Sequence, residues 1–147
     1  MKYEFKLEAV RRLREFEEEK CQREFGDALR ILEGEQKVLQ DLLVSRRRTE
    51  EAFREQTEQG DIAGQAMMYH NFLQKLANDI EVRNEKVLKA KKACEQMRQA
   101  LLMAMKKRKA LDRLKEKGEQ AFLEQLNNEE QKFINEMAIN RFMLNQK

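Results

Sequence analysis

The sequence predicts an all-α protein, a long antiparallel two-helix coiled-coil hairpin whose second helix continues past the first as a C-terminal overhang. Between Leu73 and Gln125, alternating steps of three and four residues meet 16 positions, and 11 of them are apolar. Such a narrow stripe needs a second helix to cover it along its length. With 39% charged residues, 7% aromatic residues and no proline, the chain suits a thin linear core better than a globular one.

The first helix is expected over about residues 3–59. Its apolar residues also recur at steps of three and four, with a slip near Phe16 and with Glu35 and Arg46 inside the stripe. The expected stripe comprises Leu7, Val10, Leu13, Cys21, Phe25, Ala28, Leu32, Leu39, Leu42, Thr49 and Phe53.

Residues 60–64 are the expected hinge, because Gly60 suits the left-handed position that ends a helix and Gly64 can precede the next one. So short a connection makes the two helices antiparallel. The second helix is then expected over about residues 65–143, with residue 121 facing Tyr3, and the whole chain 1–147 is read as a single coiled-coil domain.

Beyond Phe122 the second helix has no partner within the expected hairpin. Its apolar residues include Leu126, Phe133, Ile134, Met137, Ile139, Phe142 and Met143. An exposed apolar surface of this kind indicates a docking helix. Folding back, fraying and pairing with a second copy remain alternatives.

The charges are distributed unevenly, although the net charge is only +3. Residues 83–117 hold 13 basic and 4 acidic side chains, whereas residues 1–60 hold 13 basic and 15 acidic ones. The run Lys106–Lys109 is best explained as a solvated face opposite Glu15–Glu19, and we expect no nucleic-acid partner.

No catalytic or cofactor site is expected. His70 is the only histidine, no phosphate-binding loop is present, and a two-helix protein has no concave pocket in which to perturb a pKa. Cys21 and Cys94 would lie several residues out of register across the hairpin, so we expect free thiols in a reducing compartment. The chain has no membrane-spanning run and no signal peptide at its start, which favours the cytoplasm.

Four stretches resemble the FliJ family of the bacterial flagellar export apparatus. They are the opening Tyr3–Arg14, the segment Met68–Leu73 after the hinge, the basic Lys106–Lys117 and the closing Glu129–Ala138. The resemblance spans nearly the whole chain.

The resemblance implies a non-enzymatic stalk similar to the central stalk of rotary ATP synthases. It implies three kinds of partner: the hexameric export ATPase FliI, the export gate protein FlhA and export chaperones. The protein would then act at the cytoplasmic face of the inner membrane, held there through its partners. The resemblance points to Leu42, Phe72 and Leu76 for the gate, and to Phe133, Met137 and Arg141 for the ATPase ring.

Two other functions fit the same residues. The stalk of a virulence type III secretion system would need the same physical properties, and a generic dimerising coiled-coil adaptor would use the overhang to pair with a second copy. Leu42 and Leu76 also lie on the expected stripes, so packing within the hairpin is an alternative role for both. Phe72 lies off the stripe and is the stronger candidate for contact with a partner.

Overall fold

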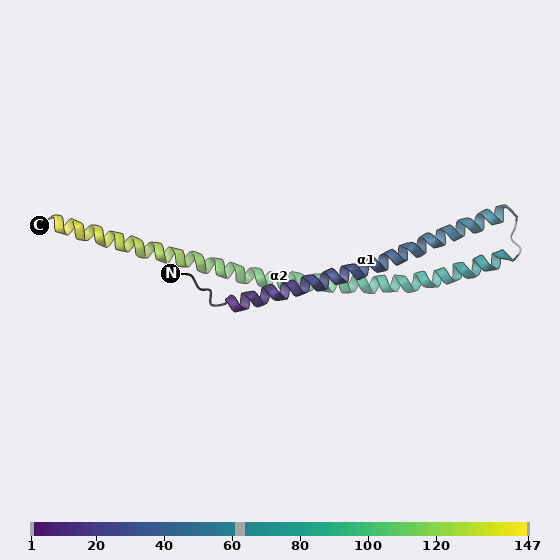
Figure 1. Cartoon of the computed structure of the whole chain (residues 1–147), viewed down its shortest axis with the longest axis horizontal. Coiled ribbons are helices and arrows are strands. Elements are labelled where there is room, and N and C mark those ends of the chain that lie inside the picture. Colours follow the sequence, from purple (N-terminus) through teal and green to yellow (C-terminus); the bar gives the residue numbers. More distant parts are fainter. Residues whose placement is uncertain (1, 61–63, 147) are drawn as a thin grey trace. The chain divides into compact units, whose positions relative to one another are not determined.

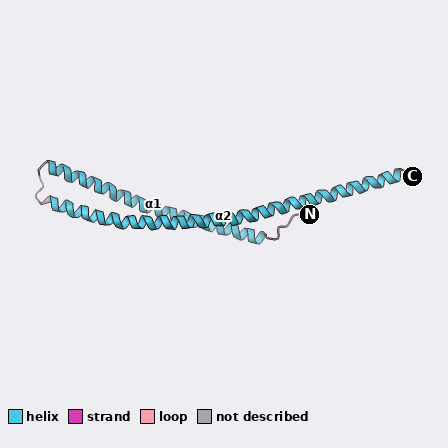
Figure 2. Cartoon of the chain, turned by 180° about the vertical axis from the view of Figure 1, so that it is seen from behind, coloured by secondary structure: helices cyan, strands magenta, loops and turns pink. Residues whose placement is uncertain are grey.

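The computed structural model describes residues 2–60 and 64–146, and over these residues the protein consists of two long helices. Helix α1 spans Glu8–Glu58 with 51 residues, and helix α2 spans Gln65–Asn145 with 81 residues (Figure 1). The described chain contains no strand (Figure 2). The two helices pack against each other, which confirms the predicted all-α hairpin.

Glycines stand where each helix meets the hinge. Gly60 has a φ of 79° and Gly64 a φ of 90°, both in the left-handed region that glycine adopts without steric cost. The amide of Gly60 donates a hydrogen bond of 3.2 Å to the carbonyl of Thr57, which closes the last turn of α1. The middle of the expected hinge, residues 61–63, lies outside the described residues.

Helix α1 begins at Glu8, five residues later than the sequence pattern suggested. Residues 2–5 have no regular secondary structure, and Lys6 and Leu7 form a turn. The amide of Glu8 donates to the carbonyl of Phe5 at 3.1 Å. Tyr3 and Phe5 are nevertheless half-buried, so this segment lies against the protein without being helical.

The described chain divides into two compact units. The hinge unit is Lys20–Leu102, and the terminal unit combines the described parts of Met1–Glu19 and Met103–Lys147. Each unit contains a piece of both helices.

In the hinge unit the core lies on the predicted stripe of α2. Its buried residues are Leu76, Ile80, Val87, Ala90 and Cys94, each 5–8% exposed. Cys21 is half-buried in the same unit, and both cysteines are free thiols, as predicted.

Helix α1 covers this stripe with half-buried side chains and has no fully buried residue. Its half-buried positions follow unbroken steps of three and four through Cys21, Phe25, Ala28, Leu32, Glu35, Leu39, Leu42, Arg46, Thr49, Phe53 and Gln56. With no third layer of structure over them, these side chains keep one edge in solvent. The two charged interruptions at Glu35 and Arg83 meet, since Nη1 of Arg83 donates to Oε2 of Glu35 at 2.5 Å.

The terminal unit has a smaller core, in which Ala104 is the only described residue that is fully buried. Along α2, half-buried side chains recur as far as Phe122 and Leu126, and residues 127–146 are all exposed. This stretch of α2 has no helix beside it, as the C-terminal end of the ribbon shows (Figure 1).

The α2 stripe makes Ile80 a test of the hairpin. Ile80 is 6% exposed, whereas Val82 on the same helix is 53% exposed. We expect Ile80→Ala to lower the free energy of unfolding by about 2–5 kcal/mol, because it removes buried carbon and leaves a cavity. Val82→Ala should change it by less than about 0.5 kcal/mol. Urea unfolding followed by circular dichroism measures both, and equal losses would contradict this placement of the core.

Candidate functional site

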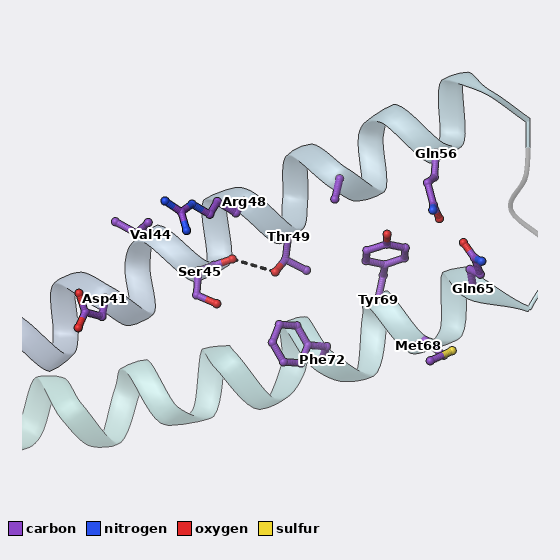
Figure 3. Close-up of a pocket in the computed structure, with 11 residues that line it drawn as sticks. Asp41, Val44, Ser45, Arg48, Thr49, Gln56, Gln65, Met68, Tyr69 and Phe72 are labelled. Carbon is purple, nitrogen blue, oxygen red and sulfur yellow. Dashed lines mark hydrogen bonds between the residues drawn. The ribbon is translucent and has the colours of Figure 1, made fainter.

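A groove opens between the two helices next to the hinge, and we call it the hinge groove. It has a volume of about 920 Å³. Its lining comprises Asp41, Val44, Ser45, Arg48, Thr49, Ala52 and Gln56 from α1 and Gln65, Met68, Tyr69 and Phe72 from α2. Figure 3 shows Tyr69 and Phe72 projecting from α2 towards α1, and Thr49 projecting towards α2.

The groove exists because the two helices contribute side chains of unequal size. On α1, Ser45, Thr49 and Ala52 are small, and the Thr49 hydroxyl donates back to the Ser45 carbonyl at 2.8 Å. These residues cannot fill the space in front of the larger side chains of α2. The rings of Phe53 and Tyr69, 5.3 Å apart between centroids, bring the two helices back into contact. The hinge groove is thus an open concave surface with an aromatic wall.

The three residues that the resemblance assigns to the gate have different surroundings. Phe72 is 45% exposed and lines the hinge groove. Leu42 is half-buried on the α1 face that covers the seam, and Leu76 is 5% exposed in the core. Of the three, only Phe72 offers a large part of its side chain to a partner in this conformation.

The three residues assigned to the ATPase ring all lie on the exposed end of α2. Phe133 is 62% exposed, Met137 is 49% exposed, and Arg141 is also exposed. Other apolar side chains exposed on this stretch are Leu123, Ile134, Ile139, Phe142, Met143 and Leu144. We call α2 beyond Phe122 the overhang. It presents far more apolar surface than isolated surface residues would.

On the α1 side of the seam in the terminal unit, charged side chains stand in place of the expected apolar ones. Lys115 lies 3.4 Å from Glu8, and Arg11 lies 3.6 Å from Asp112. Farther along, Arg108 pairs with Glu18 across the seam and with Asp112 at 2.7 Å on its own helix. The α1 residues that face α2 here are therefore polar.

This arrangement corrects the expected stripe at the start of α1. Leu7, Val10 and Leu13 were expected to face the second helix, but they are 42%, 38% and 52% exposed. Phe16, where the pattern slipped, is 57% exposed. The true seam has no slip, because Arg11, Arg14, Glu18 and Cys21 continue the steps of three and four without interruption. Three apolar side chains of α1, and Leu7 just before it, are consequently left exposed.

The ion pairs perturb the groups that form them. The pKa of Glu8 is lowered from 4.5 to about 2, mainly by its hydrogen bond from Arg11 and further by Lys115, against an opposing effect of burial. The pKa of Arg108 is raised, chiefly by Glu18 and then by Asp112. Both groups are therefore charged at neutral pH, so the seam here consists of opposite charges.

The run Lys106–Lys109 is mostly exposed, and one of its residues contacts the acidic stretch Glu15–Glu19. Arg108 turns inward to Glu18, while Lys106, Lys107 and Lys109 are exposed. Among the described residues, none of these three lysines forms an ion pair within the chain. Most of the run is a solvated face, with Arg108 as its contact to α1.

The described parts of the two helices contain no cluster that could form a metal centre. No group of histidine, cysteine, aspartate or glutamate side chains there is arranged to hold a metal ion, and His70 is exposed. Neither helix, over its described length, is apolar enough to cross a bilayer.

These features define a two-helix coiled-coil protein with a groove and an apolar overhang suited to binding other proteins. It belongs to the FliJ family, since the family model described as "Flagellar FliJ protein" matches residues 2–147. It is accordingly a coiled-coil protein related to flagellar export, from a non-catalytic family. No curated protein and no solved structure matches the chain.

The ion pairs of Glu8 give a pH-dependent contribution to stability. A carboxylate whose pKa is depressed on folding stabilises fully above its unfolded pKa and loses that effect as the pH falls. The contribution of Glu8 should be present above pH 4.5 and disappear between pH 4.5 and about 2. An NMR titration of its carboxyl carbon should show a midpoint near 2, and Arg11→Gln should move it back towards 4.5. A normal midpoint in the unmodified protein would contradict this ion pairing.

Proposed function

We propose that this protein is the stalk component of the flagellar type III export apparatus. In this role it binds the hexameric export ATPase through its terminal unit, contacts the export gate through the hinge groove, and escorts export chaperones. It works at the cytoplasmic face of the inner membrane without entering the bilayer. Membership of the FliJ family supports a role in flagellar export, and the two surfaces support the assignment of partners.

The observation that carries the proposal is the placement of side chains in the terminal unit, with charged ones between the helices and large apolar ones exposed. Ion pairs such as Glu8–Lys115 lie between its helices, while Phe16 and Phe133 face outward at 57% and 62% exposed. Partly exposed ion pairs contribute little to stability. Apolar side chains gain most when they are removed from water. A sequence selected only for a stable hairpin would place Phe16 inside and these charges in solvent, and it would not put Phe133 on a stretch with no partner helix. The outer surface is therefore suited to burial against another protein.

A binding assay on the overhang tests the ATPase partner. The double variant Phe133→Ala/Met137→Ala should bind the cognate export ATPase at least roughly tenfold more weakly, because phenylalanine and methionine are enriched at interface cores and a few such side chains carry most of the binding energy. Stimulation of ATP hydrolysis should fall with it, and the free energy of unfolding should stay unchanged.

Ile31→Ala is a matched control, since Ile31 is 61% exposed on α1 in the hinge unit. Unaltered binding by the double variant would remove the ATPase assignment. A native mass of twice 17.6 kDa that falls to the monomer mass in the double variant would instead favour the dimerising adaptor.

The hinge groove suggests a separate test of the gate contact. Phe72→Ala should weaken binding to the cytoplasmic domain of the export gate protein by about tenfold while leaving stability nearly unchanged, because Phe72 is an exposed side chain at the edge of a groove. Leu76→Ala should show the opposite pattern and lose about 2–5 kcal/mol of stability, because Leu76 is buried.

Leu88→Ala serves as the control, since Leu88 is 60% exposed on the same helix. Full binding by Phe72→Ala would exclude this side of the hinge groove as the gate contact.

A further inference from the structure

The N-terminal segment, residues 2–7, contacts α2 at Gly118, the one glycine within that helix. The ring of Tyr3 packs on Phe122 with centroids 5.8 Å apart and planes at 44°. A Cβ added at Gly118 would overlap the Tyr3 hydroxyl and stand 2.7 Å from Cζ of the ring. At Gly26 and Gly34, within α1, an added Cβ would have nothing within 4 Å. Gly118 therefore leaves a notch in α2, and Tyr3 occupies it.

This notch is continuous with the apolar face of the overhang. Gly118 and Phe122 are the last half-buried residues of the predicted α2 stripe. Leu126, Phe133 and Met137 follow at steps of four, seven and four, which keep to the same face of a helix. Exposure rises along this line, from half-buried Leu126 to Phe133 at 62%. Tyr3 thus sits where the exposed apolar face begins.

The segment that fills the notch is held by few contacts. Residues 2–5 have no regular secondary structure, Tyr3 is only half-buried, and the first ion pair to α2 along the chain is that of Glu8 with Lys115. Because residues 2–7 precede α1, they lack the continuous hydrogen-bond ladder of a helix, although the carbonyl of Phe5 accepts from the amide of Glu8 at 3.1 Å. The segment can therefore leave α2 without breaking a helix.

We propose that Gly118 and Phe122 belong to the surface bound by the partner of the overhang, and that residues 2–7 cover this part until the partner displaces them. The partner would present an apolar side chain, aromatic or branched, that takes the place of the Tyr3 ring in the notch. This inference rests on the proposed function, because it concerns the same docking face. If residues 2–7 must leave before the partner binds, the apparent affinity equals the intrinsic affinity multiplied by the fraction of molecules in which the segment is already displaced.

Removing the cover should strengthen binding. Tyr3→Ala should increase the affinity for the cognate export ATPase, held with a non-hydrolysable nucleotide, by up to about tenfold, the scale of one lost aromatic pair. Phe122→Ala should weaken binding, because it removes part of the surface itself. Unchanged or weaker binding by Tyr3→Ala would overturn the proposal, the latter because residues 2–7 would then be a direct contact.

The free protein allows a test without the partner. The chain has two tyrosines, so in a Tyr69→Phe background the fluorescence reports on Tyr3 alone. Adding Gly118→Ala should expel the ring and increase its quenching by acrylamide severalfold, whereas Gly34→Ala should leave quenching as it was. Equal quenching in both variants would show that Tyr3 does not occupy the notch.

The overhang variant separates this inference from the function on which it rests. If Phe133→Ala/Met137→Ala binds normally, the proposed ATPase contact itself fails. If that variant binds weakly while Tyr3→Ala shows no gain, the ATPase contact stands and only the covering role of residues 2–7 fails.

Discussion

The line of side chains that α2 places against α1 holds both helices in position. Isolated helices owe little of their stability to propensity, and most of it comes from packing an amphipathic face. With two layers of structure, this face is where apolar surface can be removed from water, and the buried residues Leu76, Ile80 and Val87 all lie on it. The steps of three and four must therefore run without interruption, and they do so on both helices.

The composition of this line changes between the two units. In the hinge unit it is mainly apolar and includes one charged pair, Arg83 with Glu35, whose side chains are 26% and 25% exposed. In the terminal unit the contacts are made by Arg108, Lys115 and their carboxylate partners. A partly buried ion pair adds little net stability but penalises any register in which it is broken. The hinge unit supplies most of the packing, and the terminal unit contributes alignment.

The sequence revealed the α2 stripe almost completely, because an apolar heptad pattern and a buried helix face are the same physical property. It failed at the start of α1. Two sets of side chains there are spaced so that either could face α2. Hydrophobicity alone selects Leu7, Val10 and Leu13, but the half-buried set is Arg11, Arg14 and Glu18. The charged set is inside because its partners on α2 are charged too, which becomes apparent only once the register across the hairpin is known.

The hinge groove was also beyond the reach of pattern analysis, since it depends on which side chains face each other across the two helices. Thr49 and Phe53 were both expected on the inner face, and both are half-buried there. Thr49 lies beside the hinge groove, because a small side chain opposite a ring leaves space. Phe53 packs against Tyr69, because two facing rings fill the space between the helices. The same reasoning separates Phe72 from Leu76. Both are large and apolar, but Leu76 meets the covering face of α1, whereas Phe72 meets small side chains and keeps 45% of its surface in solvent. Exposure on a concave surface, more than residue type, makes Phe72 the stronger candidate for contact with a partner.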